Sequence, residues 1–398
     1  IGTFWGAIDF DPSAGTLILE TYGFDDIFVC KFTASGSLQW AKSVGGVDHD
    51  NGAGIVLDDS SNVFITGYFG GTVDFDPGIG VDIHLSAGNT DIFVCKLNSQ
   101  GNLVWAKTFG GLEFENSTYI TLDNTGNIYT TGLFYATADF NPGTGIANLT
   151  ASGIRDIFLC KLDPQGNYVW AKRFGGTNSS GIGSGIETDD AGNVFTTGTF
   201  GSNIDFDPGP GIDIHYGGGV FISKLNASGT YVWAKTMTGS GGGGADCISL
   251  DASGAILISG GFNGTIDFNP DIAYTANLTA IGDNDCFLCK LATCHSVGYL
   301  PVVACNSYTS PSGAHTWNTS GTFRDTLPNA VGCDSIINIY LTIKNSSVST
   351  ITTSACNSYN APSGNYTWAA SRTYMHTLPT RHRCDTTLII HLRTTNTH

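Results

Sequence analysis

The sequence predicts an all-β protein built from repeats, and three observations carry this prediction. Glycine contributes 53 of the 398 residues, charged residues only 13% and aromatic residues 11%, a composition typical of many short strands and tight turns. No segment shows helical periodicity, and no apolar run approaches the ~20 residues that a membrane helix needs. The third observation is a segment that recurs along most of the chain.

The recurring segment reads DIFVCKLNSQGNLVWAKTFGG at residues 91–111. Other copies begin at Asp26, Asp156 and Gly219, and a shortened copy begins at Asp285, so successive starts are 65, 65, 63 and 66 residues apart. A fixed period of this kind indicates a repeat architecture. Inside the segment, two runs of β-branched and aromatic residues flank a turn rich in Asn, Asp and Gly, which predicts a β-hairpin.

Each full repeat predicts four strands, which in the second copy are residues 91–97, 102–109, 118–123 and 127–134. The DNTGN sequence between the last two strands supplies the residue with positive φ that a short β-turn requires. Four short antiparallel strands, repeated radially, form the blade of a β-propeller. We therefore predict a propeller of about five four-stranded blades, one of them incomplete, over residues 1–294.

The two ends of the predicted propeller do not together make a complete blade. Residues 1–8 align with the close of a fourth strand, whereas residues 285–291 form a lone first strand. We expect these two strands to pair in a closing blade whose middle two strands are absent from the sequence. Upstream blades, the C-terminal part of the chain or another molecule would complete that blade. Because Ile1 lies in the middle of a repeat, we also expect further residues upstream.

The motifs DIFVCKL, GNxVWAK, DxxGNVFxTG and TxDFDPG together resemble the SBBP-type (seven-bladed β-propeller) repeats of secreted proteins from Bacteroidetes-like bacteria. The resemblance covers residues 1 to about 293. It implies a propeller fold and secretion, and it implies no particular activity. The chain departs from the pattern in copy number, since four complete blades are predicted instead of seven.

A second repeat follows the first, with copies that begin at Ala304 and Ala355, 51 residues apart. It predicts two small β-sandwich-like modules, residues 299–344 and 350–398. The cysteines of each copy are 28 residues apart, which predicts the disulfides Cys305–Cys333 and Cys356–Cys384. Each disulfide would contribute roughly 3 to 4 kcal/mol in the loop-entropy treatment. The modules resemble tandem modules of bacterial surface and adhesin-like proteins, which implies an extracellular location.

The other cysteines fall into two groups. One group occupies a single repeat position, where we expect small buried side chains on the innermost strand of each blade: Cys30, Cys95, Cys160 and Cys289. The second group breaks the repeat pattern, and two of its members are candidates for a bridge that closes the ring: Cys247, Cys286 and Cys294.

The loops that open on D-F-D/N-P are the candidate metal site, because paired oxygen ligands two residues apart suit Ca²⁺. The ten residues are Asp9, Asp11, Asp74, Asp76, Asp139, Asn141, Asp205, Asp207, Asp267 and Asn269. The alternative is that these side chains only form turns. One tryptophan also recurs per repeat (Trp40, Trp105, Trp170 and Trp233), for which we expect packing between blades, with a lectin-like ring as the alternative.

The charge and the motifs bound the function. A formal charge of −17 argues against nucleic acid as a partner, because phosphate binding needs clustered Lys and Arg. No catalytic triad, zinc motif or phosphate-binding loop stands out, so the sequence predicts a protein that is not an enzyme. We expect a structural or adhesive protein of the cell surface, whose partners are copies of itself or a surface glycan or protein. The alternatives are a glycan-binding propeller and a propeller hydrolase or lyase.

The charge is also distributed unevenly along the chain. Residues 350–398 carry a formal +3, because four arginines stand against one aspartate, and residues 299–349 are neutral. The total of −17 therefore leaves −20 for residues 1–298. An acidic propeller and a basic tail would steer copies into head-to-tail contact, which predicts assembly into a fibre.

Overall fold

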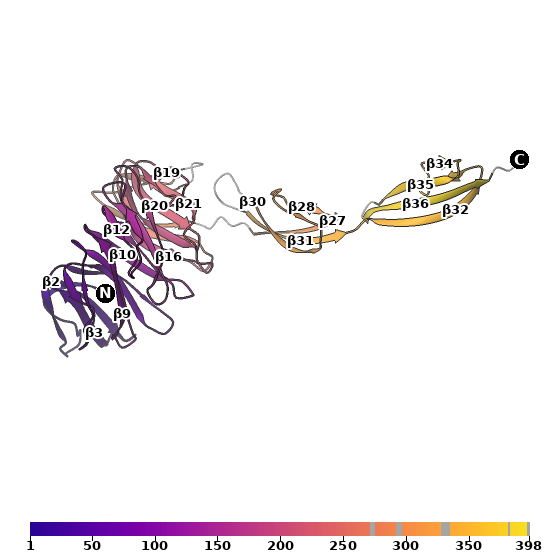
Figure 1. The fold of residues 1–398 in the computed structure, drawn as a ribbon. Helices are drawn as coiled ribbons and strands as arrows, with labels where there is room; N and C mark the ends of the chain where they lie inside the picture. The colour runs from indigo at the N-terminus through magenta and orange to yellow at the C-terminus, as the bar shows by residue number, and fades with distance from the viewer. Residues whose placement is uncertain (271–274, 292–296, 328–334, 381–382, 396–398) are drawn as a thin grey trace. The chain divides into compact units, whose positions relative to one another are not determined.

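The computed structural model describes residues 1–270, 275–291, 297–327, 335–380 and 383–395. The chain divides into two compact units, Ile1–Ala292 and Thr293–His398. The described elements are β-strands, which confirms the predicted all-β class (Figure 1). In this part of the chain no helix is long and apolar enough to cross a membrane.

The first unit is a row of propeller-like blades, numbered 1 to 5 in chain order. Blades 2 to 4 each contain four antiparallel strands. Blade 2 consists of β4 (Asp50–Leu57), β5 (Val63–Phe69), β8 (Asp91–Leu97) and β9 (Leu103–Gly111); blade 3 of β10 (Glu115–Leu122), β11 (Ile128–Phe134), β14 (Asp156–Leu162) and β15 (Tyr168–Phe174); blade 4 of β16 (Ser180–Thr188), β17 (Val194–Gly201), β20 (Gly218–Leu225) and β21 (Tyr231–Thr238).

The blade boundaries differ by two strands from the predicted unit. The sequence repeat groups residues 91–134, but the structure places β8 and β9 in blade 2 and β10 and β11 in blade 3. The reason is that β11 pairs along its whole length, from Ile128 to Phe134, with β14 across the long loop. Each blade therefore joins the second half of one repeat to the first half of the next.

The two end blades have three strands each. Blade 1 contains β1 (Gly2–Asp9), β2 (Ile18–Phe32) and β3 (Leu38–Gly46), and blade 5 contains β22 (Gly243–Leu250), β23 (Ile256–Phe262) and β26 (Asp285–Leu291). The predicted closing blade is wrong, because β1 pairs with β2 and β26 pairs with β23. β2 follows β1 directly along the chain, and only the short hairpin of residues 265–279 separates β23 from β26, so both strands pair with a partner close in sequence. In the described residues, the blades thus form an arc with two open ends.

The long loop of each repeat forms a small hairpin at the outer edge of the preceding blade. In the loop between β11 and β14 of blade 3, β12 (Thr137–Asp139) pairs with β13 (Asn148–Thr150) and also with β9 of blade 2. The corresponding hairpin β6 (Thr72–Asp74) and β7 (Ile83–Leu85) attaches to β3. The later hairpins are β18 (Ile204–Asp205) with β19 (Ile214–His215), and β24 (Thr265–Asp267) with β25 (Asn277–Thr279). Each hairpin covers an edge strand that would otherwise expose unpaired backbone groups.

The apolar core lies between neighbouring blades. Phe64, Ile92 and Val94 of blade 2 pack against Ile120 and Phe158 of blade 3, and all five are buried. The strands β4, β10, β16 and β22 contact one another from blade to blade and so form the inner edge of the arc. The repeated cysteines lie on β2, β8, β14 and β26 and not on the innermost strands as predicted. Cys95 and Cys160 are fully buried there, whereas Cys30 and Cys289 are only half-buried.

The second unit contains two modules of the same topology. In module 1, β31 (Ser335–Lys344) is central, with β27 (Val297–Cys305) parallel on one side and β30 (Gly321–Leu327) antiparallel on the other. Module 2 repeats this order with β36 (Arg383–Thr395), β32 (Ser347–Cys356) and β35 (Arg372–Thr380). Short ribbons cover the sheets: β28 (Tyr308–Thr309) with β29 (Thr316–Trp317), and β33 (Tyr359–Asn360) with β34 (Thr367–Trp368).

Among the described residues of this unit, one disulfide links the two modules, so the predicted pairing within each module is wrong. Cys305 is bonded to Cys384, and Cys356 is free and exposed. The parallel register explains the difference, since Cys356 is opposite Thr395 at one end of β36 whereas Cys384 lies near its beginning. Eleven residues of strand separate the two positions by about 36 Å, and a disulfide joins Cα atoms less than about 7 Å apart. Cys333 lies outside the described residues.

Candidate functional sites

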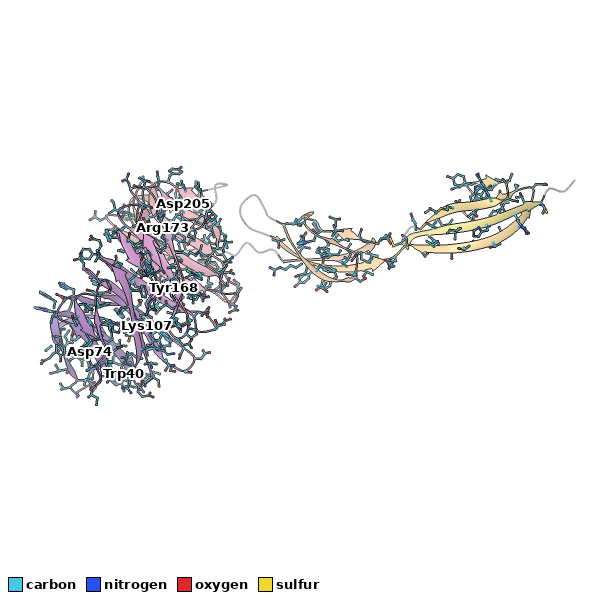
Figure 2. All side chains as sticks on the ribbon, viewed as in Figure 1. Trp40, Asp74, Lys107, Tyr168, Arg173 and Asp205 are labelled. Carbon is cyan, nitrogen blue, oxygen red and sulfur yellow. A yellow bond between two sulfur atoms is a disulfide. The ribbon has the colours of Figure 1, made fainter. Side chains whose placement is uncertain are left out.

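The first aspartate of every D-F-D/N-P loop holds the loop backbone. One carboxylate oxygen of Asp74 accepts hydrogen bonds from the backbone N–H groups of Asp76 (3.0 Å) and Asp82 (2.8 Å). The same two bonds recur, at the same distances, on Asp9, Asp139, Asp205 and Asp267. Asp74 and Asp205 thus lie in corresponding loops of the arc (Figure 2). These bonds support the turn-forming interpretation.

The other loop residues have structural contacts as well. The side-chain oxygen of Asp76 accepts the backbone N–H of Gly78 at 2.7 Å, and Asn141 does the same for Gly143 at 2.8 Å. The loop phenylalanine packs on the strand that follows the loop, as Phe75 does on Phe93 of β8 with ring centroids 5.1 Å apart. Among the described residues, no group of three or more His, Cys, Asp or Glu side chains is arranged to hold a metal ion. Calcium binding by these loops stays a prediction that needs a solution test.

The repeated tryptophans pack between blades, as expected. A Cβ atom added to the turn glycines Gly101 and Gly166 would meet Trp40 and Trp105 of the preceding blade at 3.2 Å. Both glycines have positive φ, which also excludes most other residues. Trp105 additionally lies edge-on to Phe64, with ring centroids 6.1 Å apart.

The lysine of the DIFVCK motif neutralises a turn aspartate. The Nζ atom of Lys96 lies 3.5 Å from Asp58 and 4.6 Å from the centre of the Phe64 ring. Lys224 is placed in the same way by Asp189 at 3.7 Å, and Lys161 by Asp123 at 3.9 Å. The lysine and the turn aspartate therefore recur together in these repeats because they pair with each other.

A set of buried carboxylates was missed by the sequence analysis. Asp26, which lies within β2, occupies the same repeat position as Asp91 and Asp156, which begin β8 and β14; at most 4% of each residue is exposed. Asp50 and Glu115 lie beside the first two of them and are completely buried. Burial raises the pKa of Asp50 and of Glu115 to about 7, although backbone N–H groups of Gly46 and Gly111 donate to them. Burial also raises the pKa of Asp26 and Asp91.

A cavity of about 480 Å³ opens beside the first of these carboxylates. Its lining includes Asp26 and Ser43, together with Asp74 and Asp76 of the loop between β5 and β8. Tyr22, which is 86% exposed, also lines it. The cavity therefore combines three carboxylates and an aromatic ring.

The ends of the arc expose apolar residues that other blades bury. Leu288 of blade 5 is 76% exposed, whereas its counterparts Val29, Val94, Leu159 and Ile222 are at most 2% exposed. At the other end, Phe32 of blade 1 is 45% exposed, whereas its counterparts Leu97, Leu162 and Leu225 are completely buried. An apolar cavity of about 430 Å³ lies beside Phe32, Trp40 and Ile55.

The expected bridge between non-repeat cysteines does not involve Cys247 or Cys286, because both are free and exposed. Cys247 lies on β22 and Cys286 on β26, and β23 separates these two strands. Two strand spacings amount to about 9.5 Å, which exceeds the span of a disulfide. Cys294 lies outside the described residues.

Sequence comparison supports the repeat fold and goes no further. No protein-family model matches the chain. It is 27% identical over 199 residues to an uncharacterized WD repeat-containing protein, L264, of Acanthamoeba polyphaga mimivirus, a match that covers 42% of the chain and 14% of that protein. It is 23% identical over 164 residues to the regulatory protein FlaEY of Caulobacter vibrioides, a match that covers 40% of the chain and 17% of that protein. The chain thus spans less than a fifth of the length of either relative.

Proposed function

We propose that this chain is a non-enzymatic structural or adhesive protein of the cell exterior that assembles head to tail. The observation that carries the proposal is the exposure of Leu288 at a position that four other blades bury. The other blades bury a large apolar side chain at this position against the next blade. Its exposure on blade 5 indicates a surface on which a further blade can pack. Blade 1 presents the opposite face, on which Phe32 is exposed.

The two end faces differ from each other, so a contact between them is heterologous. A heterologous contact that does not close into a ring propagates as a filament. The charge distribution acts in the same direction, because the acidic residues 1–298 and the basic residues 350–398 attract each other between copies. Such complementarity raises the association rate and fixes the orientation of the partners. An extracellular setting also suits the disulfide between Cys305 and Cys384.

Light scattering of the full chain at low salt tests the proposal. We expect large assemblies that become smaller when Leu288 is changed to Asp, because a buried charge in the contact is costly. Ile281→Asp is a matched control, since Ile281 is 90% exposed and lies in the loop before β26. A chain that stays monomeric at high concentration and low salt would contradict the proposal.

A glycan-binding function is the second candidate, and exposed aromatic residues outside the repeat pattern favour it. Trp5 is 76% exposed and Tyr22 86% exposed, and both belong to blade 1. Exposed aromatic rings stack on the apolar faces of sugars. A glycan array with the full chain, compared with the Trp5→Ala and Tyr22→Ala variants, decides this question. Absence of any bound glycan would leave only the structural function.

A further inference from the structure

The corresponding carboxylates of blades 1 and 3 have different neighbours. In blade 3, Arg173 donates a hydrogen bond from its Nη1 atom to Asp156 at 2.8 Å. The hydroxyl of Ser179 donates to the other carboxylate oxygen at 2.9 Å. The fully buried Asp156 is therefore paired with an arginine and satisfied on both oxygens. A charge-assisted pair of this kind is among the strongest polar contacts in proteins.

Blade 1 lacks that arginine. Ser43 occupies the position of Arg173 in the repeat. The hydroxyl of Ser179 accepts a hydrogen bond from the backbone N–H of Gly176. In blade 1 the carboxylate of Asp50 accepts the equivalent bond from Gly46 and so takes the place of that hydroxyl. The replacement removes one positive charge and adds one negative charge. It also leaves space, since Ser43 lines the cavity of about 480 Å³ beside Asp26.

Asp26 is 1% exposed, and its Oδ1 atom has no hydrogen-bond partner among the described residues. Within the described part of the chain, its other oxygen accepts one hydrogen bond, from the backbone N–H of Tyr22 at 3.0 Å. Asp74 and Asp76 also line the cavity, and no Lys or Arg is among the described residues that line it. A buried carboxylate without a partner is unfavourable, and a cation in the cavity would remove this cost.

We propose that this cavity binds the guanidinium group of an arginine side chain supplied by another molecule. The guanidinium would take the place that Arg173 occupies in blade 3, with its N–H groups donated to Asp26 and its charge balanced by Asp50, Asp74 and Asp76. The planar fork of a guanidinium matches a carboxylate in two-point contact, which an ammonium group cannot reproduce. The exposed ring of Tyr22 can cover the group by a cation–π contact.

The source of the arginine rests on the proposed head-to-tail assembly. The basic residues 350–398 of a second copy carry the arginines, of which Arg372, Arg383 and Arg393 lie in described strands. Arg372 and the propeller cavity of another copy have opposite charge. The inferred contact therefore adds a polar anchor to the apolar contact between blade ends.

Binding of a blocked arginine (N-acetyl-arginine amide) to the full chain tests the site without any assembly. We expect ligand-observed NMR to detect binding of this probe and at least about tenfold weaker binding of its neutral analogue N-acetyl-citrulline amide. Asp26→Asn should remove the difference between the two probes. Equal binding of both probes, or a calcium ion binding through Asp26 in place of arginine, would overturn the inference.

A gain of function provides a second measurement that does not depend on a destabilised variant. Ser43→Arg should fill the cavity from within, raise the melting temperature of the arc by about 2–4 °C and abolish binding of the blocked arginine. Thr236→Arg is the matched control, because Thr236 occupies the repeat position of Ser43. Blade 4 has Gly219 where blades 1 to 3 have an aspartate, so the new arginine would have no carboxylate to pair with. An equal rise in both variants would show that the carboxylate is irrelevant and would contradict the inference.

The source of the arginine is tested separately by substituting arginines within residues 350–398. Arg372→Gln together with Arg393→Gln should weaken assembly in light scattering and leave binding of the blocked arginine unchanged. If the chain never assembles but still binds the blocked arginine, the proposed function fails and the guanidinium site stands. If assembly persists and the probe does not bind, the site fails and the proposed function stands.

Discussion

The blade arc and the tandem modules achieve stability in different ways. The largest fully buried side chains of the described residues, including Phe93, Phe140 and Phe206, all belong to the arc. The core of module 2 has four buried residues, and the disulfide Cys305–Cys384 joins this module to module 1. A small sheet with one thin covering ribbon buries too little apolar surface to be strongly stable alone. The difference indicates that packing between blades stabilises the arc, whereas a covalent link stabilises the modules.

The largest effect is expected from removal of this link. Cys305→Ser should lower the stability of the module pair by about 4 to 5 kcal/mol, because 79 residues separate the two cysteines and a long loop gains much entropy when it is released. Hydrogen exchange should increase in β32, β35 and β36 and stay unchanged in blades 2 to 4.

Cys356→Ser is the control for this variant, because Cys356 is free and exposed. It should leave stability unchanged. Peptide mapping under non-reducing conditions should recover the Cys305–Cys384 pair. Recovery of a Cys356–Cys384 pair would contradict the structure of the module junction.

The second effect concerns packing inside the arc. Phe140 is completely buried and lies within 6 Å, ring centre to ring centre, of Phe109, Phe134 and Phe158. Phe140→Ala should lower the free energy of unfolding by about 3 to 5 kcal/mol, measured by chemical denaturation. Leu112→Ala, at a site that is 76% exposed, should change it by less than about 0.5 kcal/mol. A similar loss in both variants would show that blade packing does not stabilise the arc.

The third effect is a pH dependence of the free energy of unfolding, which we expect in the arc alone. Because burial raises the pKa of Asp50 and Glu115 to about 7, both groups hold a proton more tightly in the folded chain than in the unfolded one. Their contribution to stability is complete below about pH 4 and is lost as the pH rises to about 7 and above, at about 1.4 kcal/mol per unit of pKa shift. The negative charges near each group raise its pKa further. They are Asp25 and Asp26 for Asp50, and Asp91 and Glu113 for Glu115.

Denaturation curves at pH 5 and pH 8 measure this dependence. Asp50→Asn combined with Glu115→Gln should reduce the loss of stability between the two pH values. Asp59→Asn serves as a control because Asp59 is an exposed residue of a surface turn. A loss that stays the same in the double variant would contradict the assignment of the pH dependence to these two groups.

The smallest effect is expected from the loops. Asp139→Ala should cost about 1 to 2 kcal/mol, because two backbone N–H groups would lose their acceptor. Asp139→Asn keeps an acceptor oxygen and should cost less. A chelator should leave the melting temperature of the arc unchanged if the loops only form turns. A lower melting temperature in the chelator would instead show that these loops bind calcium.

Local chemistry made much of the fold predictable. The 65-residue period, the alternating apolar strands and the Gly-containing turns predicted the β-hairpins. The two bonds on the first aspartate of each loop agree with the tendency of Asp side chains to form turns with nearby backbone N–H groups. The Asp26 site was missed, although the sequence contained a signal for it. Arg173 is the arginine at a repeat position that is otherwise Ser43, Thr108 and Thr236, and an isolated charge in a repeat deserves a search for its partner.

The sequence by itself determined which residues form strands, which positions are equivalent between repeats and where the turns lie, because these properties depend on neighbouring residues. Only the tertiary structure decided which half-repeats share a blade, that the arc has two open ends and that Cys305 bonds Cys384. Pairings between distant segments leave no mark in a local pattern, and a 28-residue cysteine spacing is equally compatible with bonds within or between modules. The parallel register of β27 with β31 and of β32 with β36 made the choice, because it places the two cysteines of module 2 at opposite ends of its sheet.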